Sequence, residues 1–194
     1  MERERLIRGF VAVELPAEVR GFLADLADRV RSRGIRARWV HPDRMHITLR
    51  FLGEIPAPRF EAVRAALAHP IAAGGHPELA PAGIGTFPPR GRARVLWAGL
   101  RGDTAVLGRC ALEVESRLET VGFPRESRPF RPHITLARAR GPGGIVGLDR
   151  IGPEIRTAQG PGFRVTHLTL FESRLHPQGP EYLPRVTVPL VPCP

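Results

Sequence analysis

The chain has 194 residues and a hydrophobic content of 42%, which is enough to build a buried core and excludes an intrinsically disordered protein. Its net charge is +10, and because the sequence contains no lysine, all 29 basic residues are arginine. Arginine can bind a phosphate group through two parallel hydrogen bonds, so this charge fits a nucleic-acid partner. A basic and well-solvated surface without such a partner would give the same composition.

The cysteines and the apolar runs exclude several other classes of protein. Cys110 and Cys193 are the only cysteines, and two distant cysteines build neither a disulfide framework nor a metal cluster. The chain does not open with a charged and then apolar signal segment, and no apolar run is long enough to span a membrane. We therefore expect a cytoplasmic monomer with no membrane association, folded as a single bilobal domain over residues 1–194.

Segments whose apolar residues have the spacing of a strand alternate along the chain with segments whose apolar residues have the spacing of a helix. In chain order they predict a strand at 7–15, a helix at 17–33, a short strand at 36–40, a strand beginning at 46, a helix at 58–68, strands at 84–87 and 95–100, a helix at 104–121, a strand beginning at 133, and strands at 163–172 and 182–189. In the third helix, Asp103 is the expected N-cap, Gly122 ends the helix, and Cys110 belongs to the apolar stripe. This order predicts an α+β fold with antiparallel sheets.

One short pattern, His-Ile-Thr-Leu, occurs twice, at 46–49 and at 133–136. Both copies fit a strand, in which alternate side chains share a face. His46 and Thr48 should therefore share one face of their strand, and His133 and Thr135 one face of theirs. The opposite face of the first strand is predicted to carry Ile47, Leu49 and Phe51. The copies lie close to half the chain length apart, which predicts two lobes related by an approximate two-fold axis.

An imidazole beside a hydroxyl on each of two strands suits the chemistry of a phosphate diester. Hydrolysis of a cyclic phosphodiester needs a base that activates water and an acid that protonates the leaving alkoxide, and histidine can do either near neutral pH. The Thr48 and Thr135 hydroxyls and a nearby arginine could donate hydrogen bonds to the phosphoryl oxygens. Two histidines without a third ligand make a poor zinc site, so we expect no metal and no cofactor.

The residues around both motifs resemble those of a known family. The similar blocks are spread over nearly the whole chain, at residues 8–16, 39–40, 46–54, 85–88, 95–99, 130–138 and 170–175. They resemble the 2H phosphoesterases, which carry paired His-x-Thr motifs, and among these the RNA 2′,3′-cyclic phosphodiesterases, long called 2′-5′ RNA ligases. The resemblance implies a bilobal fold, in which two antiparallel sheets flanked by helices each place one motif strand at a central cleft.

The resemblance also implies the direction of the reaction. His133 would accept a proton from water, and His46 would donate a proton to the departing 3′ oxygen. An RNA end with a 2′,3′-cyclic phosphate would then become a 2′-phosphate end. Run backwards with a 5′-hydroxyl in place of water, the same site would make a 2′-5′ bond. The expected partner is therefore an RNA end with a 2′,3′-cyclic phosphate, or a related nucleotide.

Three further residues are candidates for binding the substrate. Arg138 matches a family arginine that contacts phosphate, although strict alternation puts it on the face opposite His133. It would reach the cleft only where the strand ends or bulges near Ala137. Phe87 and Phe130 are candidates to stack on a terminal base, with core packing as the alternative for at least one of them.

Two other functions fit the same residues. The protein could act on a small cyclic nucleotide or an ADP-ribose cyclic phosphate, or it could bind RNA without catalysis. Two intact His-Thr pairs argue against a module that only binds RNA.

His167 and Thr169 form a third His-x-Thr motif, but no Pro/Arg turn leads into it. We therefore expect His167 to lie outside the site.

Overall fold

The computed structural model describes residues 5–177 and 179–192. The helices are α1 (Ala17–Arg31), η1 (Pro42–Arg44), α2 (Ala57–Ala66), α3 (Thr104–Glu119), η2 (Leu148–Arg150) and α4 (Pro153–Arg156), of which η1 and η2 are 3₁₀ turns. The strands are β1 (Leu6–Glu14), β2 (Arg38–Trp39), β3 (His46–Pro56), β4 (Ile71–Ala72), β5 (Glu78–Phe87), β6 (Val95–Gly102), β7 (Ile134–Arg138), β8 (Phe163–Arg164), β9 (His167–Arg174) and β10 (Glu181–Val191). The fold is α+β, which confirms the predicted class.

The strands form one continuous path in the order β4-β10-β9-β1-β3-β7-β6-β5-β8, and β2 pairs with β7. Neighbouring strands are antiparallel except β4 and β10, which are parallel. Strands β3 and β7 are joined by a single residue pair, Ile47 with Ile134. We call the strands on the β3 side of this pair, with α2 and α3, the first lobe. The strands on the β7 side, with α1 and α4, are the second lobe.

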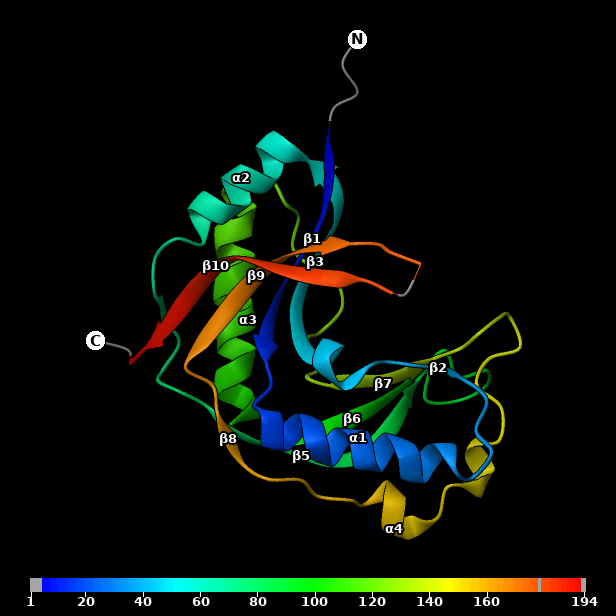
Figure 1. Ribbon diagram of the computed structural model, residues 1–194. Helices are drawn as coiled ribbons and strands as arrows, with labels where there is room; N and C mark the ends of the chain where they lie inside the picture. Colours follow the sequence, from blue (N-terminus) through cyan, green and yellow to red (C-terminus); the bar gives the residue numbers. More distant parts are fainter. Residues whose placement is uncertain (1–4, 178, 193–194) are drawn as a thin grey trace.

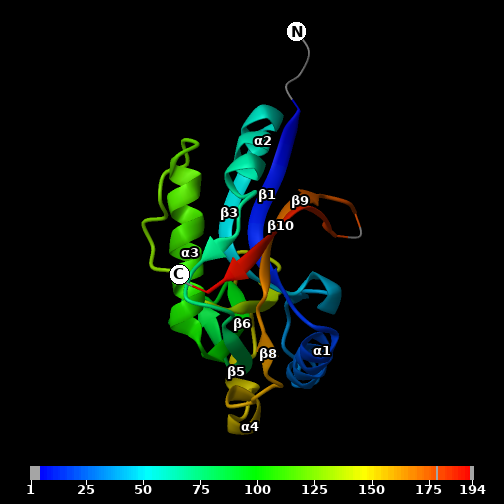
Figure 2. The same cartoon turned by 90° about the vertical axis from the view of Figure 1, so that its left-hand side faces the viewer.

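Helices cover one face of each lobe. In Figure 1, α3 lies behind the first lobe and α1 lies in front of β5 and β6. Figure 2 shows α3 and α1 on opposite sides of the molecule. The strands of each lobe are therefore covered on one side by helices, and the two motif strands meet where the lobes join.

The two lobes are not successive halves of the chain. Helix α1 follows β1 of the first lobe but covers the second lobe, and α3 follows β6 of the second lobe but packs against β3 of the first. By this division the motif strands β3 and β7 belong to different lobes. The chain crosses between the lobes several times, so both lobes depend on residues from both ends of the sequence.

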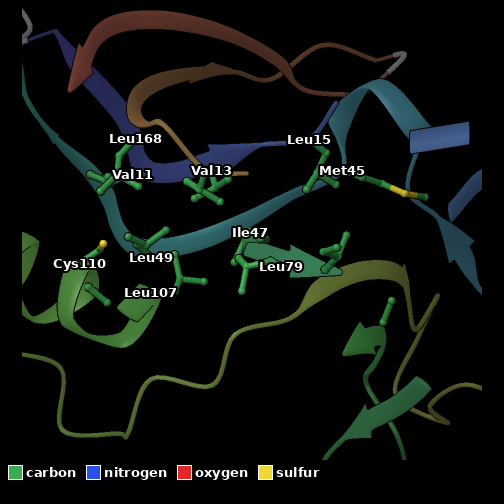
Figure 3. Close-up of a cluster of buried hydrophobic side chains, with 14 of the residues drawn as sticks. Val11, Val13, Leu15, Met45, Ile47, Leu49, Leu79, Leu107, Cys110 and Leu168 are labelled. Carbon is green, nitrogen blue, oxygen red and sulfur yellow. The ribbon is translucent and has the colours of Figure 1, made fainter. Parts of the chain in front are cut away.

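The core of the first lobe lies between its strands and α3. Ile47 and Leu49 of β3 face Leu107 and Cys110 of α3 in one buried cluster (Figure 3). Cys110 is fully buried, and burial raises the pKa of its thiol to about 11. The predicted role of Cys110 as a core residue is therefore confirmed. Cys193 lies outside the described residues.

The ends of α3 differ in one detail from the prediction. Asp103 is the N-cap residue, but its carboxylate accepts a hydrogen bond from the Glu78 backbone N–H (3.0 Å) and none from the helix. Gly122 has a φ of +83° just after the helix, a conformation that glycine adopts without strain. The segment predicted as one strand at 163–172 is divided into β8 and β9, and β5 begins at Glu78, earlier than predicted.

A β-bulge in β3 changes which side chains share a face. Adjacent residues of β1 pair with Thr48 and Arg50, so Leu49 is the extra residue of the bulge. Beyond a bulge the alternation is reset, and Phe51 therefore shares the face of Thr48. The prediction that Phe51 faces away from the motif side chains is wrong for this reason. The same reset turns Arg50 toward the interior, where its side chain is 7% exposed.

Among the described residues, no helix is long and apolar enough to cross a membrane.

Candidate active site

The pairing of Ile47 with Ile134 brings the two motifs together. Both isoleucines are fully buried in the core, so the residues on either side of them point to the opposite face. Because the pair is antiparallel, His46 lies opposite Thr135 and Thr48 lies opposite His133. All four of these side chains are half-buried. The four polar motif residues therefore gather on one face, related by the approximate two-fold axis that the motif spacing predicts.

Both histidines are oriented by a backbone carbonyl two residues earlier. His46 Nδ1 lies 2.8 Å from the Arg44 carbonyl oxygen, and His133 Nδ1 lies 2.7 Å from that of Arg131. A carbonyl only accepts hydrogen bonds, so each Nδ1 carries a proton and donates it. In the neutral ring this leaves Nε2 as the atom that can take up or release a proton.

Aromatic rings surround each imidazole. Phe10 stacks on His46 with ring centroids 4.7 Å apart, and Tyr182 meets His46 edge-on at 5.4 Å. Phe87 meets His133 edge-on at 5.0 Å, and Trp97 lies 6.3 Å from the same ring. Sequence reasoning missed the roles of Phe10, Tyr182 and Trp97, because they lie on strands other than the motif strands and no motif spacing marks them.

Burial and charge hold both imidazoles in the neutral form. Burial lowers the pKa of His46 to about 4; the hydrogen bond with Arg44 opposes this shift, and the charges of Arg138 and His133 add to it. Burial also lowers the pKa of His133, the bond with Arg131 opposes it, and Arg138 again adds to it. One arginine acts on both rings, and His133 acts on His46, so these groups share one site.

Arg138 reaches this site because β7 also contains a bulge. Adjacent residues of β6 pair with Thr135 and Ala137, which leaves Leu136 as the extra residue. Arg138 therefore shares the face of Thr135, as the sequence analysis required for a role at the cleft. In both lobes the bulged residue is the leucine of His-Ile-Thr-Leu. Phe51 in the first lobe consequently occupies the position that Arg138 has in the second.

The two candidate phenylalanines differ in their surroundings. Phe87 lies against His133 and also against Trp97, with ring centroids 5.2 Å apart. Gly85 faces the Trp97 indole so closely that a Cβ atom would overlap it, which explains glycine at this position. Phe130 is half-buried and packs against the hydrophobic core. Phe87 is thus the one of the pair that the structure brings to the histidines.

The third His-x-Thr lies on β9, which is separated from β3 by β1. His167 Nδ1 lies 3.0 Å from the Thr166 hydroxyl, and His167 Nε2 lies 3.7 Å from the Glu14 carboxylate. Thr169 is fully buried and donates a hydrogen bond to Glu14 (2.8 Å). His167 and Thr169 are therefore both partnered by Glu14, the β1 residue that pairs with His46, and within the described residues no hydrogen bond or ion pair joins them to His133 or Arg138.

Within residues 5–177 and 179–192, no group of three or more His, Cys, Asp or Glu side chains is arranged to hold a metal ion. The chemistry that the gathered side chains themselves offer is proton transfer by two imidazoles and anion binding by two hydroxyls and one guanidinium. Two imidazoles, two hydroxyls and one guanidinium on one face are the side chains expected of a two-histidine phosphoesterase.

Comparison with known proteins agrees with this class. The chain belongs to the LigT-like phosphoesterase family, which it matches over residues 13–97 and 104–182. It is 35% identical to the RNA 2′,3′-cyclic phosphodiesterase of Aeropyrum pernix, covering 84% of this chain and 91% of that protein. It is 36% identical to the protein of the same name from Thermus thermophilus, covering 91% and 86%. The crystal structure of E. coli LigT complexed with 3′-AMP superposes with a TM-score of 0.72 at 27% identity, covering 96% of this chain and 99% of LigT. The resemblance seen in the sequence is thereby confirmed.

Proposed function

We propose that the protein is an RNA 2′,3′-cyclic phosphodiesterase that opens 2′,3′-cyclic phosphate ends to 2′-phosphate ends without a metal. The observation that carries the proposal is the pair of imidazoles on one face, each with Nδ1 bound to a carbonyl and both within the field of Arg138. The names of the Aeropyrum and Thermus relatives, and the 3′-AMP complex of E. coli LigT, support the choice of substrate.

The reaction removes a proton from the attacking water on one side of the phosphorus atom and donates a proton to the leaving oxygen on the other side. His133 Nε2 takes a proton from water while the water oxygen bonds to phosphorus, and the bond between phosphorus and the 3′ oxygen breaks. His46 Nε2–H gives its proton to that 3′ oxygen, so the phosphate remains on the 2′ oxygen. Thr48, Thr135 and Arg138 donate hydrogen bonds to the phosphoryl oxygens as their charge increases. The reverse reaction, with a 5′-hydroxyl in place of water, would form a 2′-5′ bond.

The lowered pKa of His46 places a condition on its role as the acid. With a pKa of about 4, the imidazole is neutral near pH 7 in the ligand-free site. A bound phosphodiester anion offsets the charge of Arg138 and favours the protonated imidazole. Substrate binding therefore prepares His46 to act as the proton donor.

The test is product analysis on an oligoribonucleotide with a 2′,3′-cyclic phosphate end, in the presence of EDTA. We expect a 2′-phosphate product and no effect of EDTA. His46→Ala and His133→Ala should each lower kcat by about 10²–10⁴, as expected for removal of a general acid or base. His167→Ala is the matched control and should stay within about tenfold of the wild type, a barrier change below ~1.4 kcal/mol.

Each alternative gives a different result in the same experiment. A 3′-phosphate product would reverse the assignment of the leaving oxygen, and inactivation by EDTA would contradict a metal-free reaction. Turnover of a mononucleoside cyclic phosphate or an ADP-ribose cyclic phosphate, without turnover of the oligonucleotide, would identify a small-molecule enzyme. Binding of the oligonucleotide without any turnover would identify a binding module.

A further inference from the structure

The first lobe contains a fork between β1 and β9. These strands are paired from Ala12 with Thr169 as far as Gly9 with Glu172, and no pairing continues beyond that point in the described residues. From there β1 continues beside β3 while β9 continues beside β10, and Figure 1 shows the two directions diverging. A cavity of about 380 Å³ lies in this fork, a size typical of small-molecule pockets. It is lined by Leu6, Arg8, Glu172, Arg174 and Leu175, among others.

An exposed aromatic ring lies beside this fork. Phe51 is 46% exposed, and the bulge at Leu49 places it on the same face as His46 and Thr48. The Arg8 guanidinium lies 4.6 Å above the centre of the Phe51 ring. We call this pair the Phe51–Arg8 platform. A ring with an arginine over it, on the face that carries the motif residues, is a surface on which an unpaired base can stack.

The charges around the fork favour an anion. The Glu172 carboxylate is buried, with 5% of its side chain exposed, and three arginines surround it. Their nitrogens lie 2.9 Å (Arg174), 3.5 Å (Arg5) and 3.5 Å (Arg185) from its oxygens. Glu54 also lines the cavity and lies 4.0 Å from Arg8, and Glu181 acts on Arg174. Four arginines and three glutamates therefore leave one positive charge in excess around the fork, and a phosphate of a nucleic acid strand would balance it.

The platform is connected to the site through Tyr182. Burial raises the pKa of Tyr182, and the charges of Arg138, Arg44 and Arg8 all oppose this shift. Arg8 therefore lies within electrostatic reach of Tyr182, whose ring is 5.4 Å from that of His46. Along β3, Phe51 follows His46 by five residues, which at ~3.3 Å per residue is at most about 16 Å.

The proposed reaction determines on which side the RNA leaves the site. His46 protonates the 3′ oxygen, and this oxygen belongs to the terminal ribose. The ribose, and the strand attached to its 5′ carbon, therefore lie on the His46 side of the phosphorus atom, which is the first lobe. The attacking water occupies the second lobe, beside His133.

We propose that the β1–β9 fork and the Phe51–Arg8 platform bind the nucleotides immediately 5′ of the cyclic phosphate in single-stranded RNA. A base stacks on Phe51, and a backbone phosphate lies between Arg8 and Arg174. This proposal rests on the proposed function, and it makes an oligonucleotide, rather than a mononucleotide, the preferred substrate. Phe51 and Arg138 occupy equivalent positions in the two lobes. Phe51 would bind the RNA strand, and Arg138 would bind the reacting phosphate.

The first experiment compares kcat/KM for a mononucleoside 2′,3′-cyclic phosphate with kcat/KM for di-, tri- and tetraribonucleotides carrying the same end. In the wild type the ratio of oligonucleotide to mononucleotide should rise with length. Phe51→Ala should lower this ratio about tenfold, within the range measured for single base-stacking residues, and Phe51→Trp should keep it. Leu112→Ala removes an exposed hydrophobic side chain from α3 (65% exposed) and should leave the ratio unchanged.

The second experiment does not depend on catalysis. Fluorescence anisotropy measures binding of a labelled tetraribonucleotide that ends in a 3′-hydroxyl and cannot be cleaved. Phe51→Ala should weaken binding about tenfold, and Arg8→Gln should reduce the slope of log affinity against log salt by ~0.7, the loss of one phosphate contact. Arg64→Gln is the matched control, because Arg64 is also exposed and paired with a glutamate (2.6 Å from Glu61).

The outcomes separate this proposal from the proposed function. If cyclic ends are not cleaved but Phe51→Ala and Arg8→Gln change the anisotropy as expected, the fork and the platform bind RNA and the proposed reaction is wrong. If cyclic ends are cleaved but Phe51→Ala leaves both the ratio and the anisotropy unchanged, the proposal that the fork and the platform bind RNA is wrong. A change of sedimentation mass in Phe51→Ala, with an unchanged ratio, would identify the platform as a contact between two copies of the chain and would also overturn the proposal.

Discussion

Each motif histidine is held by a neutral main-chain carbonyl rather than by a carboxylate. The Arg44 and Arg131 carbonyls fix the orientation and the protonated nitrogen of the rings, but they carry no full charge that would favour an imidazolium. Burial and the charge of Arg138 therefore prevail, and the pKa of each histidine lies below its usual value. Arg138 thus adjusts the pKa of both motif histidines.

Substitution Arg138→Gln should move the pH profile of kcat/KM to higher pH. In the wild type we expect a bell whose two apparent pKa values belong to the coupled pair, with a maximum below pH 6.5. Removing the positive charge makes both imidazoles easier to protonate, so both limbs of the bell should shift upward. The maximal rate should also fall, by about 10²–10³, because a donor to the phosphoryl oxygens is lost.

The control for this shift is Arg64→Gln, which removes an arginine from the surface of α2 and should leave both limbs in place. Limbs that stay fixed in Arg138→Gln while the rate falls would mean that Arg138 binds phosphate without acting on the histidines.

At the scale of elements, a buried arginine connects the first motif strand to the segment that leads to the second motif. Arg50 Nη1 lies 2.9 and 3.1 Å from the two carboxylate oxygens of Glu115 on α3, and Nη2 donates to the Pro124 carbonyl (2.6 Å). Glu115 in turn accepts a hydrogen bond from the Glu126 backbone N–H (3.1 Å). This Arg50 cluster links β3, α3 and the connection that runs from α3 to His133.

Loss of Arg50 should destabilise the protein strongly. Arg50→Ala leaves the Glu115 carboxylate, which is 12% exposed, without its partner, and breaking a buried pair in this way costs about 3–5 kcal/mol. Arg50→Lys keeps the charge but lacks a second nitrogen to donate to the Pro124 carbonyl, so it should recover only part of the loss. Urea unfolding measures both values.

Arg64→Gln again serves as the reference, since removal of an exposed pair should change the free energy of unfolding by less than about 1 kcal/mol. Equal losses for Arg50→Ala and Arg64→Gln would show that the Arg50 cluster contributes no more than a surface ion pair.

At the scale of the whole molecule, the lobes share one core. Val11 of the first lobe and Leu96 of the second belong to the same cluster of buried residues, and the chain crosses repeatedly between the lobes. A lobe cannot unfold alone without exposing apolar surface of the other. The two motif strands are therefore held in register by the entire fold rather than by their single shared pair.

The shared core predicts a single unfolding transition. Both tryptophans, Trp39 and Trp97, lie in the second lobe, whereas α2 and α3 belong to the first. Urea unfolding followed by tryptophan fluorescence and by far-UV circular dichroism should therefore give coincident curves. A fluorescence midpoint clearly separated from the circular dichroism midpoint would indicate lobes that unfold independently.

The amino-acid sequence by itself determined most of the elements and the proposed chemistry of the site. Two copies of His-Ile-Thr-Leu predict the strands, the acid and base pair, and the hydroxyls beside them, because strand alternation is a local property. The helical period around Cys110 likewise predicts α3 and its buried side, which the structure confirms. These features follow from residues that are neighbours in the chain.

The tertiary structure alone decided which further side chains reach the site. The bulges at Leu49 and Leu136 turn Phe51 and Arg138 toward the motif face, and strict alternation within either strand predicts the opposite. A bulge is defined by the pairing between two strands, so one strand's sequence does not reveal it. The same holds for Tyr182 beside His46: its position depends on the order of β10, β9, β1 and β3, and this order is set only when distant segments pack together.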